Sequence, residues 1–270
     1  MKMPGETRRD DSLMRQMLVQ TLESLERAGV THMPRRRPTE TPASAAVTAK
    51  PPKAAVAAPQ EPVDAPLADP VKPAAGSVLP LADRQSALQA MCHEVAGCTR
   101  CSLLAASRTQ TVFGVGNPQA RLCFVGEAPG ADEDAQGIPF VGKAGQLLTK
   151  IIEACKLQRE DVYILNVLKC RPPNNRPPEP DEISNCRGFL ERQLAIIQPE
   201  FICCLGATAG KALLNSSESI GQLRGRFHSY QGIPVLCTYH PSYLLRNPNA
   251  KRDVWEDMKK LMREMGVELS

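Results

Sequence analysis

Residues 121–126, RLCFVG, form a short apolar run that ends in glycine and leads into the loop EAPGADEDAQGIPFVG at 127–142. A run of this length, closed by a turn residue, is typical of a buried β-strand rather than a helix. Three further runs of the same kind follow along the chain, at 162–168 (VYILNVL), 201–205 (FICCL) and 234–238 (PVLCT). We therefore expect four strands that are buried on both faces.

Helical patterns begin before the first of these strands and then lie between and after them, at residues 81–96, 143–156, 181–197, 207–215 and 249–265. Alternation of strands and helices predicts an α/β fold, with a mainly parallel four-stranded sheet between two layers of helices. In such folds ligands bind beyond the carboxyl ends of the strands. The functional side chains should thus come from loops 127–142, 169–180 and 239–247.

The chain before residue 81 has a different composition. Residues 1–33 include apolar side chains at helical spacing, which predicts an amphipathic helix over 11–29: Leu13, Met14, Met17, Leu18, Leu22 and Leu25. This helix is either a weakly stable surface helix or a docking element for a protein partner. Residues 34–80 are rich in proline and alanine, so we expect a disordered linker. The domain with a core then spans 81–270.

Composition limits the possible locations and chemistry. The net charge of +4 is too small to argue for nucleic-acid binding by itself. No run of 18 apolar residues occurs, and the opening MKMPGETRRDDSLMRQ lacks the apolar stretch of a secretory signal. We expect a cytoplasmic protein without a membrane span. In that reducing compartment the ten cysteines are better read as metal ligands or core residues than as disulfides.

Four cysteines stand apart by their spacing. Cys98 and Cys101 form a C-x2-C pair, and Cys170 and Cys186 lie near element ends further along the chain. One close pair of thiolates and two more from distant segments suit an iron–sulfur cluster, although zinc uses the same ligands and buried structural cysteines are a third interpretation. The remaining cysteines lie mostly in apolar runs and are expected in the core: Cys92, Cys123, Cys155, Cys203, Cys204 and Cys237.

Three motifs at strand ends complete the pattern: GEAPG at 126–130, LNVLKCRPP at 165–173 and YHPS at 239–242. Together with the four cysteine positions, they resemble the uracil-DNA glycosylase superfamily, and in particular its family 4, the iron–sulfur enzymes. The resemblance covers about residues 90–262. It implies a monofunctional DNA glycosylase that removes uracil in base excision repair, acts as a monomer and carries a [4Fe-4S] cluster on Cys98, Cys101, Cys170 and Cys186.

The resemblance also assigns roles around a base that has been flipped out of DNA. Phe140 would stack on the uracil, with core packing as the other interpretation of this residue. Asn166 would pair with uracil O4 and N3–H, because an amide offers both a donor and an acceptor. His240 would donate to uracil O2, where negative charge develops as the glycosidic bond breaks.

One position departs from the wider superfamily. Ala128, expected in the substrate pocket, stands where other branches place an aspartate that positions the attacking water. The candidates for that task are Glu127, Glu133 and Asn175. Gly130 similarly replaces a bulky ring that excludes thymine in other branches, so another group must exclude thymine here.

Contacts with DNA are expected from the loops around the pocket. The tip 242–246 (SYLLR) either fills the gap left by the flipped base or packs its leucines inward. Local positive charge is expected from Lys143, Lys169, Arg171, Arg176, Arg224, Arg226 and Arg246. Two alternatives remain: a non-catalytic iron–sulfur protein that binds nucleic acid, and a zinc-stabilised scaffold protein.

Overall fold

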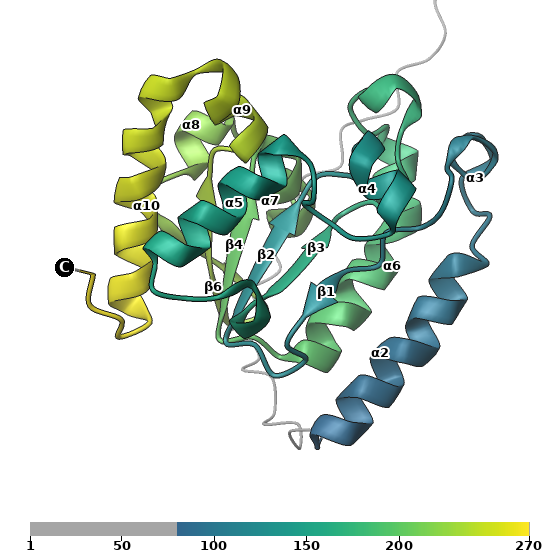
Figure 1. Ribbon diagram of the computed structural model, residues 1–270, viewed down its shortest axis with the longest axis horizontal. Helices are drawn as coiled ribbons and strands as arrows, with labels where there is room; N and C mark the ends of the chain where they lie inside the picture. Colours follow the sequence, from purple (N-terminus) through teal and green to yellow (C-terminus); the bar gives the residue numbers. More distant parts are fainter. Residues whose placement is uncertain (1–79, 270) are drawn as a thin grey trace, which may run out of the picture. The chain divides into compact units, whose positions relative to one another are not determined.

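The computed structural model describes residues 80–269, which form a sheet with helices against both of its faces (Figure 1). Its strands are β1 (Val115–Gly116), β2 (Leu122–Gly126), β3 (Tyr163–Asn166), β4 (Phe201–Leu205), β5 (Phe227–Tyr230) and β6 (Ile233–Thr238). Their order is β1-β3-β2-β4-β6-β5. The four central strands pair in parallel, and β1 and β5 add antiparallel edges.

The helices of this part of the chain are α2 (Leu81–Ala96), α3 (Ser102–Ser107), α4 (Ala131–Gln136), α5 (Lys143–Ala154), α6 (Pro180–Ile197), α7 (Ala207–Leu214), α8 (Ile220–Leu223), α9 (Pro241–Arg246) and α10 (Lys251–Glu264). Three short 3-10 turns accompany them at Arg159–Asp161, Pro173–Asn175 and Pro248–Ala250. No described helix is both long and apolar enough to cross a membrane.

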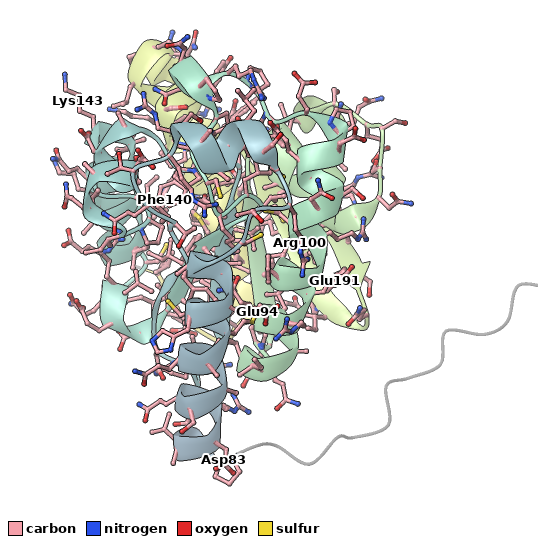
Figure 2. All side chains as sticks on the ribbon, turned by 90° about the vertical axis from the view of Figure 1, so that its right-hand side faces the viewer. Asp83, Glu94, Arg100, Phe140, Lys143 and Glu191 are labelled. Carbon is pink, nitrogen blue, oxygen red and sulfur yellow. The ribbon has the colours of Figure 1, made fainter. Side chains whose placement is uncertain are left out.

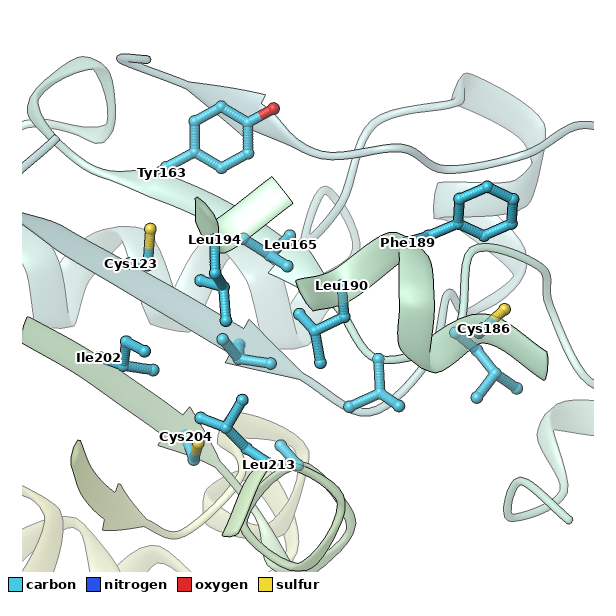
Figure 3. Packing of buried hydrophobic residues seen from close by; sticks show 14 of the residues in the cluster. Cys123, Tyr163, Leu165, Cys186, Phe189, Leu190, Leu194, Ile202, Cys204 and Leu213 are labelled. Carbon is cyan, nitrogen blue, oxygen red and sulfur yellow. The ribbon is translucent and has the colours of Figure 1, made fainter. Parts of the chain in front are cut away.

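Side-chain alternation along the strands builds two cores. Leu122 and Phe124 of β2 face one core together with residues of α5 and α10, whereas Cys123 and Val125 face the other with residues of α2 and α6. Successive side chains of a strand point to opposite faces, so a strand with apolar residues at every position buries both faces. Figure 3 shows the second core, where Leu190 and Leu194 of α6 pack over Cys123 and Leu165.

These observations confirm the predicted three-layer α/β architecture and correct the strand count. The sheet has six strands rather than four, because two short edge strands join the four that the apolar runs predicted. The second predicted strand is also shorter than expected. It ends at Asn166, and Val167 and Leu168 continue as buried loop, where their N–H groups donate to the carbonyls of Gly126 and Glu127. The helix predicted over 11–29 and nearly all of the 34–80 linker lie outside the described residues.

Candidate active site

A cavity of about 510 Å³ opens at the carboxyl ends of the four parallel strands. Its lining comes from the loops that follow β2, β3, β4 and β6, including Glu127–Gly130, Asn166, Gly206 and His240. The chain continues from β2 to β3 on one side and later returns to β4 on the other side of β2. The cavity therefore lies where an open α/β sheet places its ligands, as the sequence predicted for three of these loops.

Phe140 forms one wall of the cavity and is 6% exposed. Its backbone has φ 55°, an unusual conformation for a bulky residue. Gly145 makes room for this bend, since a Cβ there would lie 1.9 Å from the Phe140 carbonyl oxygen. Both sequence interpretations apply: the side chain packs in the core and also faces the cavity. In Figure 2 Phe140 lies within the outline of the molecule, whereas Lys143 lies at its edge.

Asn166 ends β3 and is 2% exposed. Its Oδ1 is buried and has no hydrogen-bond partner among the residues that the structure describes. The neighbouring strand ends in Gly126, where a Cβ would lie 2.3 Å from Asn166 Oδ1 and 2.5 Å from the Phe140 ring. Glycine thus allows the amide and the ring to meet. A buried acceptor without a partner is costly unless a ligand supplies a donor.

His240 precedes α9 and faces Phe140, with their ring centroids 5.5 Å apart. Its Nδ1 accepts the backbone N–H of Ser242 at 3.2 Å, and the Ser242 hydroxyl lies 2.8 Å from the same atom. Since a backbone N–H can only donate, Nδ1 is unprotonated and the neutral ring carries its proton on Nε2. Burial, assisted by the charge of Arg246, lowers the pKa of His240 to about 4. His240 is therefore a neutral donor at pH 7.

The two glutamates beside the cavity differ in their contacts. Glu133 accepts the backbone N–H groups of Gly130, Val141 and Gly142, each at 3.0 Å, so its carboxylate holds the 130–142 loop in shape. Glu127 accepts the hydroxyl of Thr208 with one oxygen, Oε2. Thr208 lies in the first turn of α7, directly after β4, a segment that sequence reasoning did not single out as functional. The signal was present as Gly206-Ala207-Thr208 directly after a buried strand.

The remaining predicted site residues also lie at the cavity. Ala128 lines it and is half-buried, next to Pro129. Asn175 is exposed at the rim, in a left-handed conformation with φ 54°, and its Oδ1 accepts Arg171 Nε at 2.8 Å. The structure thus brings every predicted catalytic and substrate-binding residue to one cavity, which no single motif could indicate.

The tip after His240 presents both kinds of side chain that the sequence allowed. Leu244 is buried in the core, whereas Tyr243 and Leu245 are 38% and 47% exposed. Inward packing and an exposed apolar tip therefore coexist on one turn of helix.

The expected positive charge is smaller than predicted. Lys169 is 1% exposed and points inward, so it adds nothing to the surface. Three of the arginines pair with carboxylates: Arg176 with Glu182, Arg224 with Asp257 and Arg226 with Glu218. Lys143 and Arg246 are exposed, and Arg246 lines the mouth of the cavity.

The four singled-out cysteines adjoin the same core. Cys170 and Cys186 are buried, and Cys98 and Cys101 pack against that core at half-buried positions. Arg108 Nη1 donates to Cys170 Sγ at 3.0 Å, and Asn185 Nδ2 lies 3.5 Å from Cys101 Sγ. The pKa of Cys170 is raised, mainly because the thiol is buried. The hydrogen bond from Arg108 opposes this shift, and charge on Cys98 and Cys101 adds to it. These thiols are thus close enough to influence one another.

Residues 80–269 contain no group of three or more His, Cys, Asp or Glu side chains arranged to hold a single metal ion. The donor set nevertheless fits a cluster, in which each thiolate binds a different iron atom and the sulfurs need not converge on one point. The N–H groups of Arg108 and Asn185 would donate hydrogen bonds to the thiolate sulfurs of Cys170 and Cys101. The other six cysteines lie in the core as expected, except that Cys92 is half-buried at the edge of the core.

Comparisons with known proteins agree with this geometry. A sequence model of the uracil DNA glycosylase superfamily matches residues 113–259. A type-4 uracil-DNA glycosylase of Thermotoga maritima is 46% identical over 66% of this chain and 94% of its own length. Those of Archaeoglobus fulgidus and Sulfurisphaera tokodaii are 43% and 44% identical, over 63% and 67% of this chain and 88% and 85% of theirs. With its cavity, strand-end motifs and cysteines in place, the chain belongs to the uracil-DNA glycosylase superfamily, in its type-4 branch.

Proposed function

We propose that this chain hydrolyses the N-glycosidic bond of uracil in DNA, releasing free uracil and leaving an abasic site for base excision repair. The observation that carries the proposal is the buried Oδ1 of Asn166, which has no hydrogen-bond partner within residues 80–269 and belongs to a cavity that Phe140 and His240 also line. Uracil supplies the missing donor through N3–H and accepts the amide N–H at O4. Cytosine has an unprotonated N3 and an amino group at C4, so it would leave the amide mismatched.

The leaving group explains the role of a neutral histidine. When the bond between C1′ and N1 breaks, its electron pair stays with the base and negative charge develops on O2. The Nε2–H of His240 donates to that oxygen without giving up its proton, while Ser242 fixes the ring. The Phe140 ring, held by its backbone conformation, stacks on the base and keeps it at the bottom of the cavity.

Water must reach C1′ from the other side of the sugar. Of the three candidates, Glu127 is best suited, because within residues 80–269 only one of its oxygens accepts a hydrogen bond, from Thr208. Glu133 already accepts three backbone N–H groups, and Asn175 accepts Arg171. We therefore assign Glu127 to orienting the water and offsetting the positive charge on the sugar. Glu133 and Asn175 hold the loops to which they belong.

The enzyme is monofunctional. The residues described around the cavity include no lysine that could form a Schiff base with the sugar. Incubation with borohydride should consequently trap no covalent adduct with DNA.

Cys98, Cys101, Cys170 and Cys186 are the residues that would hold a [4Fe-4S] cluster. When bound, the cluster would cross-link the α2–α3 segment and the loop after β3. Its role would be structural, because hydrolysis of the glycosidic bond transfers no electrons. We expect the chain to act as a monomer in the cytoplasm. The segment 11–29 keeps the two interpretations given above, a weakly stable surface helix or a docking element for a protein partner.

A uracil-containing oligonucleotide, treated with the purified protein and then with alkali, tests the activity. Strand breaks at uracil, with none at cytosine in the same sequence, are expected. Binding of DNA without any breaks would instead favour the non-catalytic iron–sulfur alternative. A colourless protein that contains zinc would favour the scaffold alternative.

A further inference from the structure

The first turn of α7 carries a side chain that bonds to a residue of the cavity. The hydroxyl of Thr208 donates to Oε2 of Glu127, although the two residues are 81 positions apart in the chain. Glu127 directly follows β2 and lines the cavity, whereas Thr208 follows β4, the strand that pairs with β2. The bond therefore joins the two middle strands of the sheet where both of them end.

The residues between β4 and Thr208 lie close to the other side of the cavity. Gly206 has φ 93°, a conformation that favours glycine, and a Cβ there would lie 3.1 Å from the Cβ of His240. Gly206 and the next residue, Ala207, both line the cavity. The start of α7 is thus packed against the cavity wall, so Thr208 reaches Glu127 from a fixed position.

The carboxylate of Glu127 depends on this bond for its orientation. Within residues 80–269 its other oxygen, Oε1, accepts no hydrogen bond, and no lysine or arginine forms an ion pair with it. The Glu127 carbonyl accepts the N–H of Leu168 at 3.1 Å, which fixes the main chain but leaves the side-chain torsions free. Because rotamer entropy opposes the ordering of a glutamate side chain, a bond from a fixed helix selects one orientation.

We propose that Thr208 is a positioning residue that holds the Glu127 carboxylate in the orientation from which it directs water at the sugar. The inference rests on the proposed function, in which Glu127 orients that water. With Oε2 bonded to Thr208, Oε1 is left to accept a hydrogen bond from the water. A carboxylate free to rotate would align the water with C1′ for only part of the time. Thr208 does not itself line the cavity, so it acts through Glu127.

The test replaces Thr208 with valine, which keeps the shape of the side chain and removes the hydroxyl. We expect the single-turnover rate of uracil release at saturating enzyme to fall roughly tenfold. The enzyme concentration that gives half of that rate should change by less than about twofold, because the groups that hold the base are unaltered. Thr208→Ser keeps the donor and should recover nearly the wild-type rate. An unchanged rate in Thr208→Val, or an equal loss in Thr208→Ser, would overturn the proposal.

A second measurement determines whether Thr208 acts through Glu127. Thr208→Val is combined with Glu127→Ala, which leaves no carboxylate to position. The effects should then not be additive, and the double variant should release uracil as fast as Glu127→Ala alone. A further loss in the double variant, equal to that of Thr208→Val alone, would show that Thr208 acts independently and would contradict the inference.

Thr238→Val is the matched control. The Thr238 hydroxyl also donates to a carboxylate, Oδ2 of Asp257, at 2.7 Å, and both residues are buried and do not line the cavity. Loss of that bond should lower the melting temperature and leave the single-turnover rate unchanged. If Thr238→Val slowed uracil release as much as Thr208→Val, the specific role of Thr208 would be wrong.

The remaining outcomes separate this inference from the proposed function. A wild-type chain that releases no uracil overturns the proposed function and the role of Thr208 with it. Uracil release by the wild type, with an unchanged rate in Thr208→Val, contradicts only the role of Thr208. If Thr208→Val does not fold, Thr208→Ala takes its place, and an unchanged rate in that variant counts equally against the proposal.

Discussion

The backbone N–H of Ser242 donates to Nδ1 of His240, so the first turn of α9 fixes both the orientation and the protonation of the imidazole. The ring acts as the cap of its own helix, a task more often performed by a side-chain oxygen. The remaining proton lies on Nε2, the nitrogen left free to donate.

This arrangement predicts a flat pH profile. His240 has a pKa lowered to about 4, mainly by burial, so the neutral form that donates through Nε2 persists over the whole range from about pH 6 to pH 8. Uracil release should be constant there and fall only near pH 4. Because the unfolded histidine takes up a proton first, the stability that this residue contributes above about pH 6.5 is lost as pH falls toward 4. Nitrogen NMR of the ring, assigned with His240→Asn, checks the titration; a midpoint near 6.5 would contradict it.

Asn166→Asp should lower kcat/KM for uracil by roughly 100-fold at pH 7, because the carboxylate loses the amide donor and repels uracil O4. Single-turnover assays with uracil and cytosine substrates measure the change. Asn117→Asp is the control: it makes the same substitution in the turn before β2, at the other end of the sheet. A comparable loss in both variants would point to a general effect of charge.

Glu133→Ala should destabilise the fold, because three backbone N–H groups of the 130–142 loop lose their acceptor. We expect a loss of about 1–3 kcal/mol in the free energy of unfolding, measured by urea titration. Glu127→Gln should instead leave stability nearly unchanged and reduce kcat. The opposite pattern would exchange the roles assigned to the two glutamates.

Iron content should depend on four cysteines. Alanine substitution of Cys98, Cys101, Cys170 or Cys186 is expected to remove absorbance near about 400 nm and to lower solubility. Cys203→Ala, in the middle of β4, should keep the iron and lose roughly 1 kcal/mol of stability. Iron analysis of all ten single variants decides the assignment, which fails if Cys123, Cys155 or Cys237 proves essential and Cys186 does not.

A chain that begins at residue 81 should retain nearly full activity on oligonucleotides. The first described helix starts at Leu81, and the family match begins further along, at residue 113. Comparison of kcat/KM and melting temperature between the full and shortened chains tests this. A large loss of either would show that part of residues 1–80 belongs to the catalytic unit.

The strands were predictable where burial leaves a continuous apolar run. β2 and β4 are buried at every position, and both were expected at nearly their observed bounds. β1 and β5 were missed because they are only two and four residues long and partly exposed, so no run marks them. The second strand was extended too far, since Val167 and Leu168 are buried in a loop whose hydrogen bonds replace the ladder.

The site was predictable in its residues and less so in their contacts. The roles of Phe140, Asn166 and His240 were assigned through the resemblance to the uracil-DNA glycosylase superfamily, on segments at or after the ends of predicted strands. Lys169 was expected at the surface, since lysine is rarely buried, and its bond to Asn166 becomes visible only once the loop folds back. The bond from Thr208 of α7 to Glu127 similarly joins residues separated by 81 positions. Sequence patterns report periodicity along the chain, whereas these bonds depend on proximity in space.

The two antiparallel edge strands also affect whether the sheet can pair with the sheet of another molecule at high concentration. Each end of the row of parallel strands is covered by a short strand that runs the other way, with β1 spanning only two residues. A neighbouring molecule that approached either edge would find few free backbone groups with which to extend the sheet. We therefore expect the strongly apolar central strands to be kept from pairing with strands of other chains, which would limit aggregation.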